Sequence, residues 1–162
     1  MKTENFFLRY AYPCAYIIMQ RGEITSEQLK ELEQIAIDNK EISREKLEKI
    51  FHRAFEYIDR LAEIRCSYRW DKGVIEEYFY SYHNEVIDNG EGVYSKVPTI
   101  LKELSKVEEA IIVDKKEDAL TVEYKGNDGK TKTRNVLNHF VPDAKVNDKV
   151  TIHYGYAIEI VE

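Results

Sequence analysis

The pattern of apolar and polar residues changes character once along the chain. Up to about residue 105, apolar residues recur at three- and four-residue spacing, which is typical of amphipathic helices. After that point apolar and polar residues alternate and β-branched residues become frequent, which is typical of strands. The sequence therefore predicts an α+β protein with two domains, an all-α helical domain over residues 1–105 and a small β domain over residues 106–162.

Start and stop signals divide the helical part. The aromatic and apolar stretch at residues 4–20 predicts a buried helix that begins near Pro13, because proline is tolerated in a first turn, and that ends at Gly22. Two later segments each combine an apolar residue, a hydroxyl cap and an acidic first turn, with Thr25 and Ser43 as the caps. The segment capped by Ser43 predicts a helix over residues 43–66, and further helices are predicted over residues 73–88, with Asp71 as the cap, and 98–105.

Four or five short alternating segments make up the β part. Asp128-Gly129 separates two of them and predicts a hairpin turn, since glycine adopts positive φ without strain. The longest alternating stretch, residues 145–160, is either one strand or two strands joined at a bend. A sheet this small is stabilised by closure, which leaves no exposed edge, so we predict a small antiparallel barrel.

One face of the stretch at residues 145–160 carries a histidine among small residues. Thr151, Gly155 and Ala157 flank His153 on that face, which leaves the imidazole on a patch that another backbone or a ligand could approach closely. We predict a protein-contact surface made of four residues: His153, Tyr154, Gly155 and Tyr156. The alternative is that these tyrosines pack between the two domains.

Composition narrows the function classes. The chain has 162 residues and a formal charge of -6, which argues against broad binding to phosphate backbones. Two cysteines make no disulfide framework, the N-terminus lacks the order of a signal peptide, and the longest apolar run is too short to span a bilayer. We therefore expect a cytoplasmic protein without a membrane segment.

Motifs for catalysis are missing from the sequence. It contains no nucleophile–base string, no glycine-rich phosphate loop and no metal-binding motif, so we predict a protein that is not an enzyme. If a helix begins at Pro13, Cys14 lies in its first turn, where free N–H groups favour a thiolate. The alternative is that Cys14 is a small core residue.

The end of the chain carries a string of histidine, any residue, glycine, aromatic residue and alanine at His153–Ala157. With this string as its most specific part, the segment of residues 108–162 resembles the hydrogenase-assembly chaperone family of the HypC/HupF type. Other matching segments stand in the same order and spacing: Ala119–Tyr124, Leu137, Val141–Ala144, Val146–Asp148 and Val150–Ile152.

This resemblance implies an OB-like β-barrel that binds proteins and does not catalyse a reaction. Members of the family are thought to hold an iron fragment with cyanide and carbon monoxide ligands and to deliver it to a hydrogenase large-subunit precursor, together with a second maturation protein. Their key cysteine follows the initiator methionine, where this chain has Lys2. A thiolate would therefore have to come from Cys14 or Cys66. Because a thiolate and an imidazole together suit iron, the resemblance makes Cys14 and His153 the candidate metal ligands.

Two functions follow as expectations. The first is a HypC-like interaction module in metallocentre assembly, with a maturation factor or a metalloenzyme precursor as its partner and iron as the candidate cofactor. The alternative is an OB-type protein that binds single-stranded nucleic acid through Lys130, Lys132, Arg134 and neighbouring tyrosines. The acidic net charge favours the first.

Overall fold

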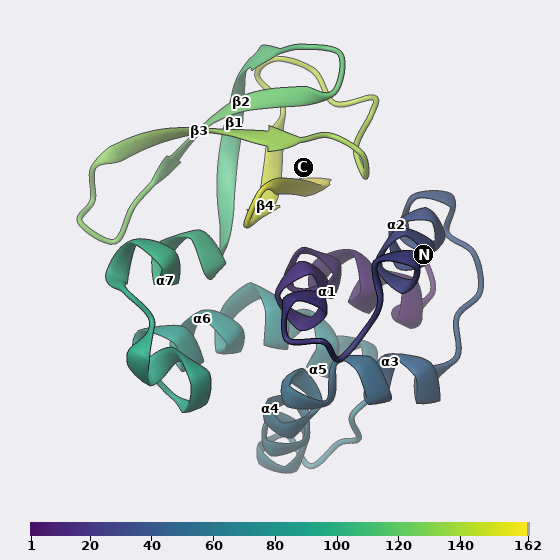
Figure 1. The fold of residues 1–162 in the computed structure, drawn as a ribbon. Helices are drawn as coiled ribbons and strands as arrows, with labels where there is room; N and C mark the ends of the chain where they lie inside the picture. Colours follow the sequence, from purple (N-terminus) through teal and green to yellow (C-terminus); the bar gives the residue numbers. More distant parts are fainter. Residues whose placement is uncertain (162) are drawn as a thin grey trace. The chain divides into compact units, whose positions relative to one another are not determined.

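The protein has an α+β fold in which helices come first and strands follow (Figure 1). The computed structural model describes residues 1–161, and the chain divides into two compact units, Met1–Tyr82 and a second that begins at His83. The last helix ends at Ser105 and the first strand begins at Val107, where the sequence pattern changes. Two α-helices and a 3₁₀-helix thus belong to the same unit as the strands. The division into domains 1–105 and 106–162 stays a prediction.

The first unit is helical and has an aromatic core. Phe7 is completely buried, and its ring lies 4.8–5.6 Å from four other aromatic rings, those of Phe51, Phe55, Trp70 and Phe79. Offset and edge-on ring pairs at these distances add stability beyond the burial of apolar area. The elements that carry this core are α1 (Thr3–Gln20), α2 (Ser26–Asp38), α3 (Arg44–Ile50), α4 (His52–Ile64), α5 (Lys72–Glu77) and a π-helix (Tyr78–Tyr82).

Side-chain caps begin three of these helices where the sequence predicts them. Thr25 and Gln28 form a capping box at the start of α2, and the Ser43 hydroxyl accepts a hydrogen bond from the Lys46 N–H at the start of α3. Asp71 accepts from two backbone N–H groups at the start of α5. Each cap satisfies donors that have no partner within the helix.

Two predicted helix boundaries are wrong. Helix α1 begins at Thr3 rather than near Pro13, and the proline lies inside the helix. The cost of an interior proline is offset here because the surrounding turns, from Tyr10 to Ala15, are almost entirely buried. The predicted helix at 43–66 is two helices, since Phe51 leaves helical geometry at φ -102° and ψ 33° between α3 and α4.

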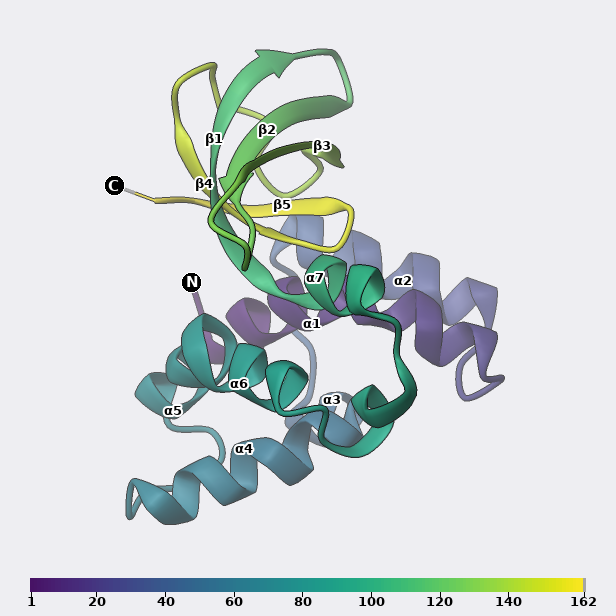
Figure 2. The ribbon, with the colours of Figure 1, turned by 90° about the vertical axis from the view of Figure 1, so that its left-hand side faces the viewer.

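The second unit is built around a closed sheet. Its strands are joined in the order β1-β2-β3-β5-β4, and β4 pairs back with β1, which closes a ring that we call the β-ring (Figures 1 and 2). Apolar side chains that alternate along the strands fill its interior. The elements of this unit are α6 (His83–Asp88), a 3₁₀-helix (Gly92–Lys96), α7 (Thr99–Ser105), β1 (Val107–Lys115), β2 (Ala119–Lys125), β3 (Thr131–Leu137), β4 (Lys149–His153) and β5 (Tyr156–Val161).

The sheet is mixed, which corrects the prediction of a purely antiparallel one. Four of its neighbouring pairs are antiparallel, and β3 pairs with β5 in parallel through Leu137 and Tyr156. The reason is topological. Strand directions cannot alternate all the way round a ring with an odd number of members, so five strands require at least one parallel pair.

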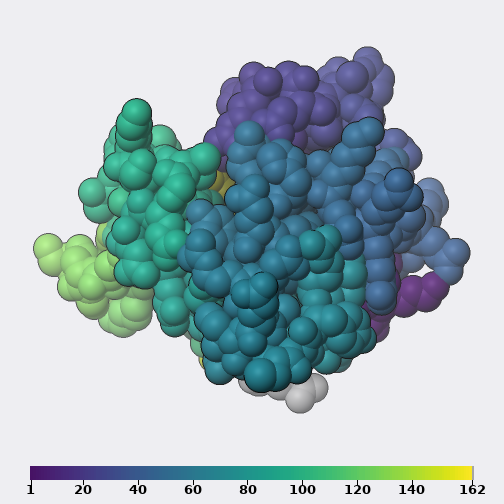
Figure 3. Space-filling model, turned by 90° about the horizontal axis from the view of Figure 1, so that it is seen from below, coloured from purple at the N-terminus to yellow at the C-terminus, as the bar shows by residue number. Residues whose placement is uncertain are grey.

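The turn between β2 and β3 lies beside the segment that enters β1. Gly129 has φ +74°, as the predicted hairpin turn at Asp128-Gly129 requires. The ammonium group of Lys106 donates a hydrogen bond of 2.9 Å to the Asn127 side chain in this turn. Figure 3 shows the turn, in light green, at the surface next to the green helical segment that precedes β1.

The capping box at α2 gives a first test of the helical unit. Replacing Thr25 with Ala removes the acceptor for the Gln28 N–H, and we expect the unit to lose about 1 kcal/mol of unfolding free energy. Trp70 is the only tryptophan and lies in this unit, so its fluorescence in a urea titration reports the loss. The control Lys30→Ala, at an exposed position of the same helix, should change the value by less than about 0.5 kcal/mol. Equal losses in both variants would contradict the capping role.

Candidate functional site

The turn between β4 and β5 is held from two directions. On one side, the Tyr154 N–H donates to the carbonyl of Leu104 at 3.1 Å, and the hydroxyls of Ser105 and Tyr154 lie 2.6 Å apart. On the other, the Gly155 carbonyl accepts from the Leu137 N–H at 2.7 Å. The turn is therefore fixed between α7 and the end of β3.

Gly155 is the exposed point of this turn. A Cβ atom placed there would meet nothing within 4 Å, and the backbone does not adopt positive φ. Tyr154 before it has φ +48°, an uncommon conformation for a non-glycine residue, and is half-buried. Gly155 thus leaves open space in front of the turn without being required for its geometry.

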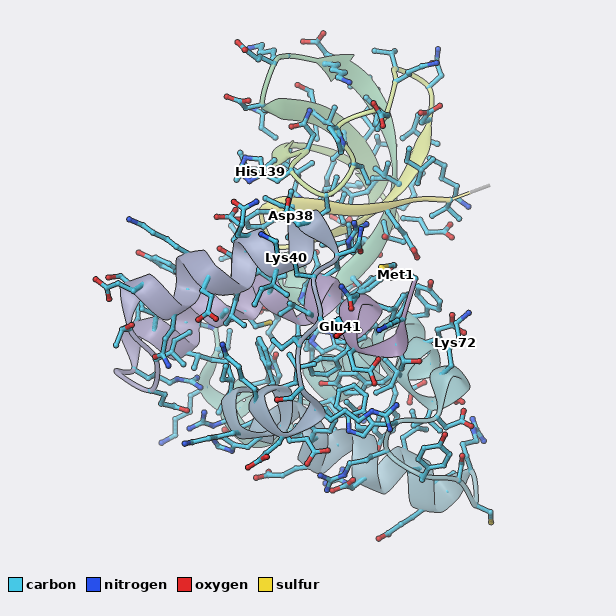
Figure 4. The ribbon with its side chains drawn as sticks, turned by 90° about the vertical axis from the view of Figure 1, so that its right-hand side faces the viewer. Met1, Asp38, Lys40, Glu41, Lys72 and His139 are labelled. Carbon is cyan, nitrogen blue, oxygen red and sulfur yellow. The ribbon has the colours of Figure 1, made fainter. Side chains whose placement is uncertain are left out.

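Tyr156 continues the surface on the other side of Gly155. Its half-buried ring stacks on Phe140 at a centroid distance of 5.5 Å, and the His139 ring lies 6.0 Å away. Figure 4 labels His139 on the loop that follows β3. The accessible part of the predicted contact surface therefore lies at Gly155 and Tyr156, beside a histidine that the sequence analysis did not include.

His153 does not stand on an open patch, which contradicts that part of the prediction. His153 is completely buried. Its ring packs edge-on against the His83 ring, with the centroids 5.1 Å apart and the ring planes at 80°. The reason is that β4 is buried on both faces, one toward the interior of the β-ring and the other, at His153, against α6. Binding of a partner to the remaining residues of the contact surface stays a prediction.

His83 is the residue that sequence reasoning missed. It begins α6, and the neighbouring Asn84 fixes this helix to β1 through two hydrogen bonds with the backbone of Val107, at 2.7 and 3.0 Å. Burial lowers the pKa of His83 to about 4, with a hydrogen bond involving Asn84 acting in the opposite direction. The two histidines are 70 positions apart in the sequence, and no local pattern relates residues across that distance.

The candidate metal ligands fit iron poorly. Cys14 lies within α1 rather than in a first turn, and although part of the residue is exposed, burial raises the pKa of its thiol to about 12. A thiol must be deprotonated to bind a metal, so this environment opposes the role. Cys14 and His153 belong to different units, and their pairing stays a prediction. Among residues 1–161, no three His, Cys, Asp or Glu side chains gather as metal ligands would.

The basic residues of β3 do not form one exposed stripe. Lys130, just before the strand, is exposed, but Lys132 donates to both carboxylate oxygens of Glu103 at 2.7 and 2.8 Å. The Arg134 guanidinium lies over the ring of Tyr124, 4.8 Å from its centroid. These two cations serve contacts within the unit and are not presented together to a phosphate backbone.

A hollow of about 390 Å³ lies in the first unit, where α1 begins beside the segment after α2 (Figure 4). Its charged side chains are already paired: Lys2 with Glu41, and Arg44 with Glu4. Asn5 also donates to the Lys40 carbonyl. These contacts join the two segments and account for the polar groups around the hollow.

Comparison with protein-family models, with curated proteins and with solved structures finds no match for this chain. Within the part of the chain that the structure describes, no helix has the length and apolar character needed to cross a bilayer.

The buried His83 predicts an acid-sensitive fold. An unfolded histidine titrates near pH 6.5, and the folded pKa is lower, so the unfolded state takes up the proton first and stability is lost as the pH falls from about 6.5 toward 4. We expect His83 to account for a loss of about 2 kcal/mol between pH 7 and pH 5. Urea titrations should show a smaller loss in His83→Phe, which keeps a ring against His153. An identical pH dependence in wild type and His83→Phe would contradict this account.

The two cysteines should differ in reactivity. Cys66 is exposed, whereas the raised pKa of Cys14 keeps its thiol protonated at pH 8. We expect iodoacetamide to alkylate Cys14 roughly a hundredfold more slowly than Cys66, as followed by peptide mass spectrometry. Comparable rates at the two residues would show that Cys14 forms an accessible thiolate after all.

Proposed function

We propose that the β-ring is an OB-like barrel that serves as a protein-interaction module. The strand order supports the fold part of this proposal, because a five-stranded Greek-key barrel of the OB type closes in the order β1-β2-β3-β5-β4. The parallel pairing of β3 with β5 agrees with that arrangement. The long connection from β3 to β4 is a loop rather than a helix.

We further propose a role in metallocentre assembly of the hydrogenase type, with no catalysis by this chain. The observation that carries the proposal is the β4–β5 turn, which presents an exposed glycine and a half-buried tyrosine while its backbone is fixed by α7 and β3. A preformed turn loses little conformational freedom when it binds. The same residues belong to the string that resembles the hydrogenase-assembly chaperones. The partner is a maturation factor or a metalloenzyme precursor.

Gly155→Arg tests the contact directly. The position has open space and ordinary φ, so the variant should fold normally and place a bulky charge where a partner would approach. In co-purification from cells that express a hydrogenase large-subunit precursor and its maturation proteins, we expect wild type to retain one of them and Gly155→Arg to lose it. Thr133→Arg, which adds the same side chain to an exposed position on β3, should retain it. If wild type, Gly155→Arg and Thr133→Arg all retain the partner, or if none of them does, the proposed contact is contradicted.

The iron content of the purified complex distinguishes a protein that carries iron from one that only docks on its partner. We expect the anaerobically purified complex to form without iron bound to this chain, since burial raises the pKa of Cys14. Metal analysis of wild type and Cys14→Ala checks this. Iron that is present in wild type and absent from Cys14→Ala would show that the chain carries iron itself.

Binding of single-stranded nucleic acid is the second candidate, because OB-type barrels also serve that function. The engagement of Lys132 with Glu103 and the burial of the Arg134 guanidinium weigh against it. Salt-dependent binding of a labelled oligonucleotide that Lys130→Ala weakens would favour it over the protein-binding role.

A further inference from the structure

Arg134 is the least expected side chain inside the β-ring. All three nitrogens of its guanidinium group are buried, and none has a hydrogen-bond partner among residues 1–161. The group lies over the ring of Tyr124 at 4.8 Å, which contributes a cation–π interaction but accepts no conventional hydrogen bond. Buried polar groups are almost always hydrogen-bonded, so an arginine with several donors and no acceptor requires an explanation.

The charged side chains of the neighbouring residues already have partners. Lys132 is paired with Glu103, and Lys106 is paired with Asp88 and hydrogen-bonded to Asn127. No ion pair joins Arg134 to either of these acids. Moving one of them to Arg134 would leave a lysine without its partner, so these groups do not satisfy the guanidinium.

Glu108 is the acid that remains. It is half-buried, and burial raises the pKa of its carboxyl group, with Lys106 and then Arg134 acting in the opposite direction. Glu108 shares the strand face of Ala110 and Ile112, which belong to the core of the β-ring. It therefore points toward the same interior as Arg134, which shares its strand face with the core residue Val136.

These two side chains come from strands that are not neighbours. Glu108 lies on β1 and Arg134 on β3, and β2 lies between them and contributes Tyr124. The arginine offers donors without an acceptor, and the glutamate offers acceptors, with the Tyr124 ring beside the guanidinium group. We call these three residues the polar cluster.

We propose that the polar cluster binds a carboxamide group. The carbonyl oxygen of the amide accepts from Arg134, its NH₂ group donates to Glu108, and its plane packs near the ring of Tyr124. A carboxylate or a phosphate would satisfy Arg134 but would bring a second negative charge next to Glu108, whereas a neutral amide leaves the charge balance unchanged. The amide belongs either to a free small molecule or to an Asn or Gln side chain of a partner.

An NMR titration tests this inference. Backbone spectra of the ¹⁵N-labelled protein are recorded with acetamide, with a capped glutamine peptide, with acetate and with inorganic phosphate at matched ionic strength. We expect saturable shifts at Glu108, Tyr124 and Arg134 with at least one of the two amides, and weaker effects with both anions. Saturation by acetamide identifies a site for free small amides, and saturation by the peptide alone identifies a side chain of a partner.

Matched variants localise the binding. Arg134→Met and Glu108→Met should each weaken amide binding by roughly tenfold or more, as loss of a buried hydrogen bond implies. The exposed neighbours Lys130→Met and Glu109→Met should bind as wild type does. Either Arg134→Met or Glu108→Met suffices for the test if the other variant fails to give a native spectrum. Equal binding by all variants, preferential binding of acetate or phosphate, or no binding of either amide would overturn the proposal. None of these results bears on the contact at Gly155, which is tested separately.

Discussion

Closure of the β-ring by the contact between β3 and β5 is the constraint on which the second unit depends. Among residues 1–161, one residue pair, Leu137 with Tyr156, defines this parallel junction, supported by the hydrogen bond from the Leu137 N–H to the Gly155 carbonyl. Without the junction, β3 and β5 would both be free edges, and open edges invite pairing with other chains. The same junction sets the position of the β4–β5 turn. The proposed contact surface and the closure of the sheet thus rest on the same few atoms.

The two units are stabilised by different means. The first depends on aromatic rings gathered around Phe7, with side-chain caps defining where its helices begin. The second buries polar and ionisable groups as well as apolar ones. His83 and His153 lie ring to ring where α6 meets β4, and Arg134 lies with Tyr124 inside the β-ring. Groups of this kind are costly to bury, so they concentrate the pH sensitivity and the binding potential of the protein in the second unit.

Local signals in the sequence predict local structure well in this protein. Thr25, Ser43 and Asp71 identify helix starts because a cap depends on only a few neighbouring residues. Gly129 identifies its turn for the same reason. Pro13 misleads because tertiary packing keeps it inside α1 despite its local preference to begin a helix. The parallel pair of strands was predictable in principle, since five strands cannot close a ring in any other way.

The candidate site was harder to predict because it depends on contacts between distant residues. Alternation along β4 places His153 opposite the core face, but only the position of α6 shows that this second face is also buried. In the same way, the spacing of Lys132 and Arg134 suggests a basic stripe, and their partners Glu103 and Tyr124 come from other elements. Residue type and spacing identify which side chains share a face, and they do not reveal what covers it.

Hydrogen exchange at the Leu137 amide, combined with nuclear Overhauser contacts between Leu137 and Tyr156, tests the closure of the β-ring most directly. A closed ring predicts strong protection of this amide and backbone contacts between the two residues, since its N–H lies 2.7 Å from the Gly155 carbonyl. Exchange at the rate of an unprotected amide, together with no contact between β3 and β5, would mean that the sheet is open and that the β4–β5 turn is not fixed as described.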